Sequence, residues 1–134
     1  MKTNSITIDI CNKRKVKDVM FFLQKNWKKN HILSKNKKIV EYFYDNGKKF
    51  NFIIAECNKQ IVGIMGYILN SRYSRKKNNK FDIVWPSVLC IDDGYPGIGL
   101  KIFDFYSKKF KSKNFGLINF NSKAKNFYKI FSNK

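Results

Sequence analysis

Hydrophobic and polar residues alternate at the start of the chain with the period of a strand and then with that of a helix. Isoleucines occupy every second position of Ile6–Ile10, as in a strand with one buried face. Apolar residues then recur three or four positions apart over residues 16–27 and again over 37–45. These two segments are predicted to be amphipathic helices. Asn46-Gly47 is expected to end the second one, because both residues tolerate the left-handed conformation.

A hairpin is predicted next. Residues 50–57 and 60–69 are apolar and rich in isoleucine, and the short segment Asn58-Lys59 separates them. We expect two antiparallel strands joined by this turn. Gly63 and Gly66 lie inside the second strand, where glycine indicates a bulge or the close approach of another group.

The rest of the chain repeats strands and helices in alternation. Residues 81–91 read as a strand that Pro86 interrupts, so a bulge or bend is expected there. A glycine-rich turn, an amphipathic helix up to residue 110, a strand over 115–120 and a helix over 122–131 follow. The last strand–helix–strand unit should be a parallel, right-handed crossover. We therefore predict one α/β (α+β) domain over residues 1–134, with a mixed sheet covered by helices on both faces.

The formal net charge of +19 is the most unusual property of the composition. A basic surface attracts phosphates, so a lysine-rich nucleic-acid-binding domain is one interpretation. Arginine is the residue that recognises phosphates and bases in a bidentate way, yet only Arg14, Arg72 and Arg75 are arginines. We interpret the lysines mainly as a solvated surface that also attracts an anionic cofactor, and we do not expect nucleic acid to be the partner.

Metal, disulfide and membrane sites find little support in the sequence. Cys11, Cys57 and Cys90 lack the spacing of a zinc site or a disulfide framework, and His31 is the sole histidine. We expect no metal. No signal peptide precedes the first strand, and no apolar run reaches the roughly 20 residues of a membrane span. A cytoplasmic protein with reduced cysteines is the expectation.

The candidate chemistry lies in the turn between a strand and a helix that contains Gly94, Gly97 and Gly99. Glycines let the backbone approach a ligand closely, and the start of a helix offers unpaired N–H groups that bind phosphates. The spacing differs from the dinucleotide fingerprint, in which the narrow gap comes first. It also lacks the Gly-Lys-Ser/Thr of a Walker loop, because Leu100 follows the last glycine.

With this turn the chain resembles the GNAT superfamily of acyl-CoA N-acyltransferases over essentially its whole length. The family carries Q/R-x-x-G-x-G/A between a bent strand and a helix. Gly97 and Gly99 match its two small positions, whereas Gly94 replaces the usual Gln or Arg, which removes a side-chain contact to phosphate. A second family element, N-x-x-A-x-x-x-Y, is matched on the last predicted helix by Asn121, Ala124 and Tyr128.

The resemblance implies direct acetyl transfer from acetyl-CoA to a small primary amine in a ternary complex. The strand before the turn would hold the pantetheine arm through the backbone of Leu89, Cys90 and Ile91. The turn and the first helical residues would hold the diphosphate: Gly94, Tyr95, Pro96, Gly97, Ile98, Gly99 and Leu100. Asn121 would contact the arm, and Tyr128 would protonate the departing thiolate. His31 lies in the region that overlies the acceptor pocket, where it would bind substrate or take its proton.

Several of these residues have a plain structural alternative. Tyr128 stands among aromatic residues and could serve packing, and a lone histidine such as His31 is more often structural. Cys90 could be imagined as an acyl-accepting nucleophile, but no histidine is nearby in sequence to activate it, so a buried thiol is the better interpretation. Possible bases or amine anchors, with solvated charge as the alternative, are Asp82, Asp92 and Asp93.

The family pattern and this sequence diverge after Tyr128. The family continues into Gly-Phe and two further strands, whereas Ser132 occupies the glycine position here and the sequence stops at Lys134. We expect a truncated sheet without the usual last two strands. A homodimer or a partner chain would complete it, or activity would be impaired, which leaves an inactive CoA-binding relative as an alternative. Residues 27–47 are also similar to GNAT-like proteins from bacterial surface-polysaccharide clusters, and this implies an amino-sugar acceptor.

Overall fold

A computed structural model describes residues 5–75, 82–111, 114–116 and 129 of the chain. Five strands form one sheet in the order β1-β2-β3-β4-β5. Neighbouring strands are antiparallel except for β4 and β5, which are parallel. The elements in chain order are β1 (Ile6–Ile10), η1 (Lys13–Lys15), α1 (Val16–Asn26), α2 (Ile32–Lys35), α3 (Lys37–Tyr44), β2 (Phe52–Cys57), β3 (Gln60–Leu69), η2 (Asn70–Tyr73), β4 (Ile83–Ile91), α4 (Ile98–Lys109) and β5 (Asn114–Phe115).

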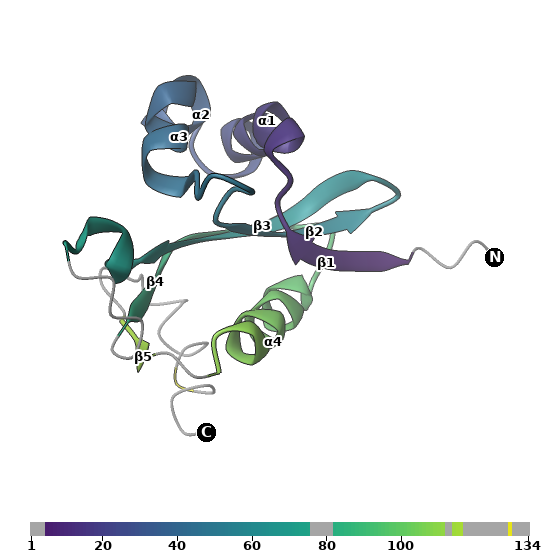
Figure 1. Ribbon diagram of the computed structural model, residues 1–134. Coiled ribbons are helices and arrows are strands. Elements are labelled where there is room, and N and C mark those ends of the chain that lie inside the picture. The colour runs from purple at the N-terminus through teal and green to yellow at the C-terminus, as the bar shows by residue number, and fades with distance from the viewer. Residues whose placement is uncertain (1–4, 76–81, 112–113, 117–128, 130–134) are drawn as a thin grey trace.

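Helices cover both faces of the sheet, as predicted. Helices α1, α2 and α3 lie on one face and α4 lies on the other (Figure 1). Phe52 and Ile54 of β2 join the cluster under α1 and α3, whereas Ile53 and Ala55 join the cluster under α4. Strands β2 and β3 are therefore apolar on both sides, which explains their nearly continuous hydrophobic runs. On the described residues, no helix is long and apolar enough to cross a membrane.

The predicted hairpin of β2 and β3 is confirmed. Asn58 and Lys59 connect the strands with φ values of +49° and +66°. Positive φ at both central residues is the geometry of a two-residue turn whose twist matches that of paired strands.

The irregularities predicted for β3 and β4 are confirmed and coincide. Gly66 pairs with Val88 and Tyr67 with Pro86, so Ser87 is an extra residue that bulges out of β4. Gly63 meets the predicted close approach, because a Cβ there would lie 2.9–3.0 Å from isoleucine side chains of β4 and α4. The bulge bends β4 next to Pro86, which has no N–H to offer a ladder.

The boundaries differ from the predictions in several places. The sequence pattern missed α2, whose four residues are too few for a periodic signal. The strand predicted over 50–57 begins only at Phe52, because Phe50 forms an isolated bridge with Asp45. The strand predicted over 81–91 begins at Ile83. Strand β5 covers Asn114–Phe115 of the described residues. The rest of the predicted strand and the predicted helix over 122–131 lie outside the described residues, except for Gly116 and Lys129.

Candidate functional site

The connection between β4 and α4 is a tight turn organised by one aspartate. The Asp92 carbonyl accepts from the Tyr95 amide at 2.9 Å, and its Oδ1 accepts from the Gly94 amide at 2.9 Å. Gly97 then adopts a φ of +85° and serves as the N-cap residue of α4. Of the three glycines, Gly97 is therefore the one that requires the left-handed conformation, and the helix begins directly after it.

The N-terminus of α4 is partly open to solvent, because Gly97 and Leu100 are exposed and Gly99 is half-buried, whereas Ile98 is buried. Among the described residues no side chain caps it, and its first turn holds no acidic residue. Gly97 is exposed, and a Cβ placed on it would have no heavy atom within 4 Å. The amide of Ile98 has only a long contact, 3.4 Å, to the Tyr95 carbonyl. Unpaired amides and the positive end of a twelve-residue helix are thus presented together, which is the arrangement that binds phosphates elsewhere.

Strand β4 has an edge that runs from this turn toward β5. The described part of β5 pairs with β4 only at Ile83 and Val84, and the Gly116 amide donates to the Val84 carbonyl at 3.0 Å. The Asp92 amide donates to Val62 of β3 at 2.9 Å. Backbone groups alternate in direction along an antiparallel strand, so Cys90 faces β3.

Leu89 and Ile91 consequently direct their N–H and C=O groups away from β3, toward the side on which β5 lies. Both belong to the three residues predicted to hold a cofactor arm, and they lie on the same edge that leads to the open turn. Cys90, the third, turns its backbone the other way. Its side chain is 6% exposed within the cluster under α1 and α3. Burial raises the pKa of Cys90 to about 11, so the group is a neutral thiol near pH 7, as its structural interpretation requires.

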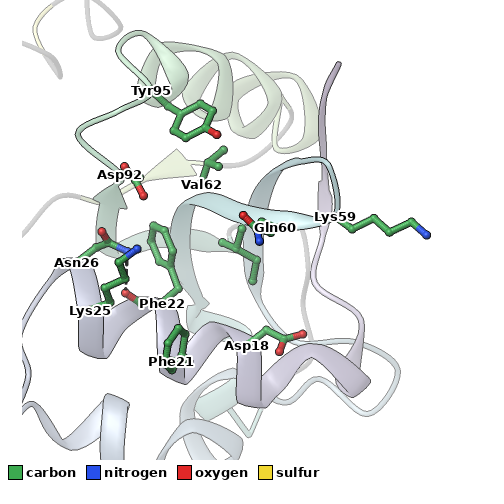
Figure 2. A pocket seen from close by; sticks show the side chains of 11 residues that line it. Asp18, Phe21, Phe22, Lys25, Asn26, Lys59, Gln60, Val62, Asp92 and Tyr95 are labelled. Carbon is green, nitrogen blue, oxygen red and sulfur yellow. Dashed lines mark hydrogen bonds between the residues drawn. The ribbon is translucent and has the colours of Figure 1, made fainter. Parts of the chain in front are cut away.

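A cleft of about 390 Å³ lies on the other side of the turn, between α1, the β2–β3 turn and the end of β4. Figure 2 shows Asp18, Lys25 and Asn26 reaching in from α1, with Asp92 and Tyr95 on the opposite wall. Two predicted site residues line this cleft: Tyr95, a predicted cofactor contact, and Asp92, a possible base or amine anchor. A hydrogen bond with Cys57 raises the pKa of its phenol. The mixed charges of the lining suit a polar ligand rather than an apolar one.

His31 has a structural task in the fold. Its Nδ1 accepts from the Leu33 amide at 3.2 Å and caps α2, and its ring lies 4.3 Å from that of Trp27. While it caps the helix, neutral His31 carries its proton on Nε2, so it can donate to a substrate but can take a proton only by giving up the cap. Its role toward a substrate stays a prediction.

The remaining candidate residues have different outcomes in the structure. Asp82 is buried and accepts from both the amide (2.8 Å) and the hydroxyl (2.6 Å) of Ser71, which is a structural arrangement. Asp93 lies exposed in the turn. Asn121 and Tyr128 lie outside the described residues. Within the described part of the chain, no group of three or more His, Cys, Asp or Glu residues could hold a metal ion.

Comparison with known proteins gives a uniform result for the fold. No family model and no curated protein sequence matches the chain. Arabidopsis thaliana NAA60 in complex with acetyl-CoA matches with a TM-score of 0.71 and 14% identity, over 96% of this chain and 86% of that one. Arabidopsis thaliana Naa50 in complex with the bisubstrate analogue CoA-Ac-MVNAL gives 0.69 and 17%, over 95% and 82%.

A GNAT-family acetyltransferase of Streptococcus pneumoniae gives a TM-score of 0.61 and 19% identity, over 96% of this chain and 86% of that one. The chain also matches a longer Pyrococcus horikoshii protein with a TM-score of 0.70 and 13% identity, over 98% of this chain but only 44% of the longer one. At these identities the likeness establishes the fold.

Proposed function

Since the chain has the fold of the GNAT acetyltransferases, we propose that it transfers an acetyl group from acetyl-CoA to a primary amine. The observation that carries the proposal is the uncapped N-terminus of α4, which stands at the end of a β4 edge that pairs with no described residue between Ser87 and Ile91. A diphosphate and a long polar arm need these two features side by side.

The turn would hold the diphosphate through amides rather than side chains. The N–H groups of Ile98, Gly99 and Leu100 belong to the first turn of α4. The left-handed Gly97 has no side chain that would stand between them and a phosphate. The missing Gln or Arg at Gly94 removes one ionic contact. The net charge of +19 compensates over a longer range, because it raises the local concentration of an anionic ligand at low salt.

Leu89 and Ile91 would hold the pantetheine arm with their outward-facing backbone groups. A backbone N–H of β4 would also polarise the thioester carbonyl as its oxygen gains charge. The amine attacks the carbonyl carbon as a neutral nucleophile, and the C–S bond then breaks. The amine loses a proton to solvent, and Tyr128 donates one to the thiolate, so the products are an N-acetylated amine and CoA. Holding both reactants in one complex supplies much of the acceleration.

The proposed acceptor is a small amine, with an amino sugar as the leading candidate. Naa50 was solved with an analogue that joins CoA to a short peptide, so a peptide N-terminus belongs in any acceptor test. The panel should therefore contain an amino sugar, a polyamine, an arylalkylamine and a tetrapeptide with a free N-terminus.

The first experiment measures urea unfolding with and without acetyl-CoA, followed by release of the CoA thiol with each amine of the panel. Acetyl-CoA at 100 times its dissociation constant should raise the free energy of unfolding by about 2.7 kcal/mol. Unchanged unfolding would refute the proposal. Stabilisation without thiol release from any amine would leave an inactive CoA-binding protein. Tight RNA binding that weakens steeply with salt, together with indifference to acetyl-CoA, would favour a nucleic-acid-binding domain.

A further inference from the structure

A buried tyrosine that lies 43 residues earlier in the chain reaches the bulge of β4. The hydroxyl of Tyr44, the last residue of α3, lies 2.8 Å from Oγ of Ser87. Tyr44 is 3% exposed, whereas Ser87 is exposed. The pair therefore joins the interior of the protein to the surface at the one residue that bulges from β4.

The glycine opposite the bulge leaves the space for this contact. A Cβ on Gly66 would lie 2.8 Å from Oγ of Ser87 and 3.0 Å from Cε1 of Tyr44. Real Cβ atoms do not tolerate such distances, so any side chain at position 66 would push the two hydroxyl-bearing residues out of place. The ring of Tyr44 is held on its other side by Phe52, with centroids 4.2 Å apart in a stacked arrangement.

The end of α3 is fixed by one of the few arginines. Arg72 of η2 donates to the carbonyls of Tyr42 and Asp45, and at 3.4 Å to that of Glu41. A cation at the C-terminal carbonyls stabilises a helix, and a planar guanidinium reaches several acceptors at once. The Asn51 amide donates to the Tyr44 carbonyl at 2.7 Å. Main chain and side chain of Tyr44 are therefore both held.

Either hydroxyl of the pair can donate to the other. Burial raises the pKa of Tyr44, so its phenol stays protonated in both arrangements. In either direction the Ser87 oxygen keeps a lone pair that can accept from an N–H group on the exposed side.

The bulge lies where a ligand running along β4 would end. Four strand steps separate Ile91, beside the phosphate-binding turn, from Ser87, a distance of about 13 Å. Beyond the bulge the edge is closed, because β5 pairs with β4 at Val84. The face toward α4 is also closed there by the buried Tyr106, whose hydroxyl donates to the Val84 carbonyl at 3.4 Å. A second reactant can reach this point from the face that carries Ser87.

We propose that the Ser87 hydroxyl binds the acceptor amine next to the thioester, and that Tyr44 is a positioning residue that holds Ser87 in the required orientation. The inference rests on the proposed acetyl transfer and assigns the acceptor side of that site. Ser87 hydrogen-bonds an N–H of the amine and so turns the nitrogen lone pair toward the carbonyl carbon. Tyr44 acts only through Ser87.

The test compares the Michaelis constants for the two substrates, with acetyl-CoA and the amine of the panel that wild type acetylates fastest. Ser87→Ala and Tyr44→Phe should each raise the KM of the amine about 3- to 10-fold, as expected for one lost hydrogen bond. The KM of acetyl-CoA should not change. Ser87→Thr keeps the hydroxyl and should restore the amine KM. Matched controls are Ser107→Ala, at a half-buried serine of α4, and Tyr42→Phe, at an exposed tyrosine of α3.

The double variant separates positioning from a general structural effect. If Tyr44 acts through Ser87, Tyr44→Phe should add nothing to the amine KM in the Ser87→Ala background. Amine KM values equal to those of the controls, or full additivity in the double variant, would overturn the inference while leaving the acetyl transfer intact. Wild-type protein without turnover would instead overturn the proposed function and this inference together. Should Tyr44→Phe fail to fold, Ser87→Ala and Ser87→Thr still decide the outcome.

Discussion

Replacing Gly97 by glutamate places a carboxylate at the point where the diphosphate is proposed to bind. Gly97 has a φ of +85°, and no heavy atom of the described residues lies within 4 Å of a Cβ placed on it. The new side chain therefore meets no steric barrier from the described part of the chain, and its cost to folding comes from the backbone. A non-glycine residue in the left-handed region costs about 1–2 kcal/mol.

The effect on acetyl-CoA should be larger than the effect on stability. A carboxylate about 6 Å from two phosphate charges, at an effective dielectric constant of about 40, opposes binding by about 3 kcal/mol. That is roughly a hundredfold rise in the dissociation constant. At the acetyl-CoA concentration that stabilises wild type by about 2.7 kcal/mol, the variant should gain only about 0.4 kcal/mol.

Gly47 offers a matched control for the backbone cost. It has a φ of +91°, it is exposed, and it too has no heavy atom within 4 Å of a Cβ. It follows α3, far along the chain from the turn before α4. Gly47→Glu should lose about the same 1–2 kcal/mol of stability and keep the full response to acetyl-CoA. Gly97→Gln adds the strain without the charge and should keep most of the response.

The assay is urea unfolding of the four proteins, with and without acetyl-CoA at one fixed concentration. A full response of Gly97→Glu to acetyl-CoA would refute the assignment of the diphosphate to this turn. If Gly47→Glu lost the stabilisation by acetyl-CoA to the same extent, backbone strain or total charge would explain the effect, and the site would not be needed.

Three further predictions concern stability. Gly63→Val should lower the free energy of unfolding by about 1–3 kcal/mol, because its Cβ would lie 2.9–3.0 Å from isoleucine side chains. An unchanged urea midpoint would contradict this close contact. Burial raises the pKa of Cys11 to about 12 and that of Cys90 to about 11, from an ordinary 9.0. Above pH 9 the thiols therefore ionise in the unfolded chain but not in the folded one, so the free energy of unfolding should fall as pH rises. Replacing both cysteines by alanine should make this fall less steep, and an identical slope of the free energy of unfolding against pH would refute the prediction. Arg72→Lys should cost about 1 kcal/mol in urea unfolding, since a single ammonium nitrogen lacks the planar fork that reaches the carbonyls of Glu41, Tyr42 and Asp45 from two nitrogens. A variant as stable as wild type would show that these carbonyls need no guanidinium.

The order of the elements could be predicted because most of them bury one clear face. The isoleucines of Ile6–Ile10 and the apolar stripes of α1 and α3 follow the periods of 2 and 3.6 residues. The same reasoning missed α2, because its four residues are held by local hydrogen bonds at both ends rather than by an apolar stripe. The His31 side chain caps its N-terminus, and the Asn36 amide donates to the Ile32 carbonyl at its C-terminus.

The site could be predicted only in part. Three glycines marked a turn before a helix, but the position of the helix start decides which of them must be left-handed. The structure gives that task to Gly97 and places Gly99 within the first turn of α4. The alternation along β4 likewise separates Leu89 and Ile91 from Cys90, a distinction that depends on the register with β3.

Contacts between distant segments left no pattern in the sequence. Tyr44 is 43 residues from Ser87, and each belongs to an element that is explained without the other. From the sequence Asp82 is a possible base, but in the structure it accepts hydrogen bonds from Ser71, which lies 11 residues away. Such pairs become visible only when the sheet and its covering helices are assembled.

Titration of ¹⁵N-labelled protein with acetyl-CoA shows whether bare backbone amides hold the cofactor, because it reports on each amide separately. The largest shifts are expected at Ile98, Gly99 and Leu100 and at Leu89 and Ile91, with a smaller change at Cys90. Shifts spread over the lysine-bearing surface, with these amides unmoved, would contradict this expectation.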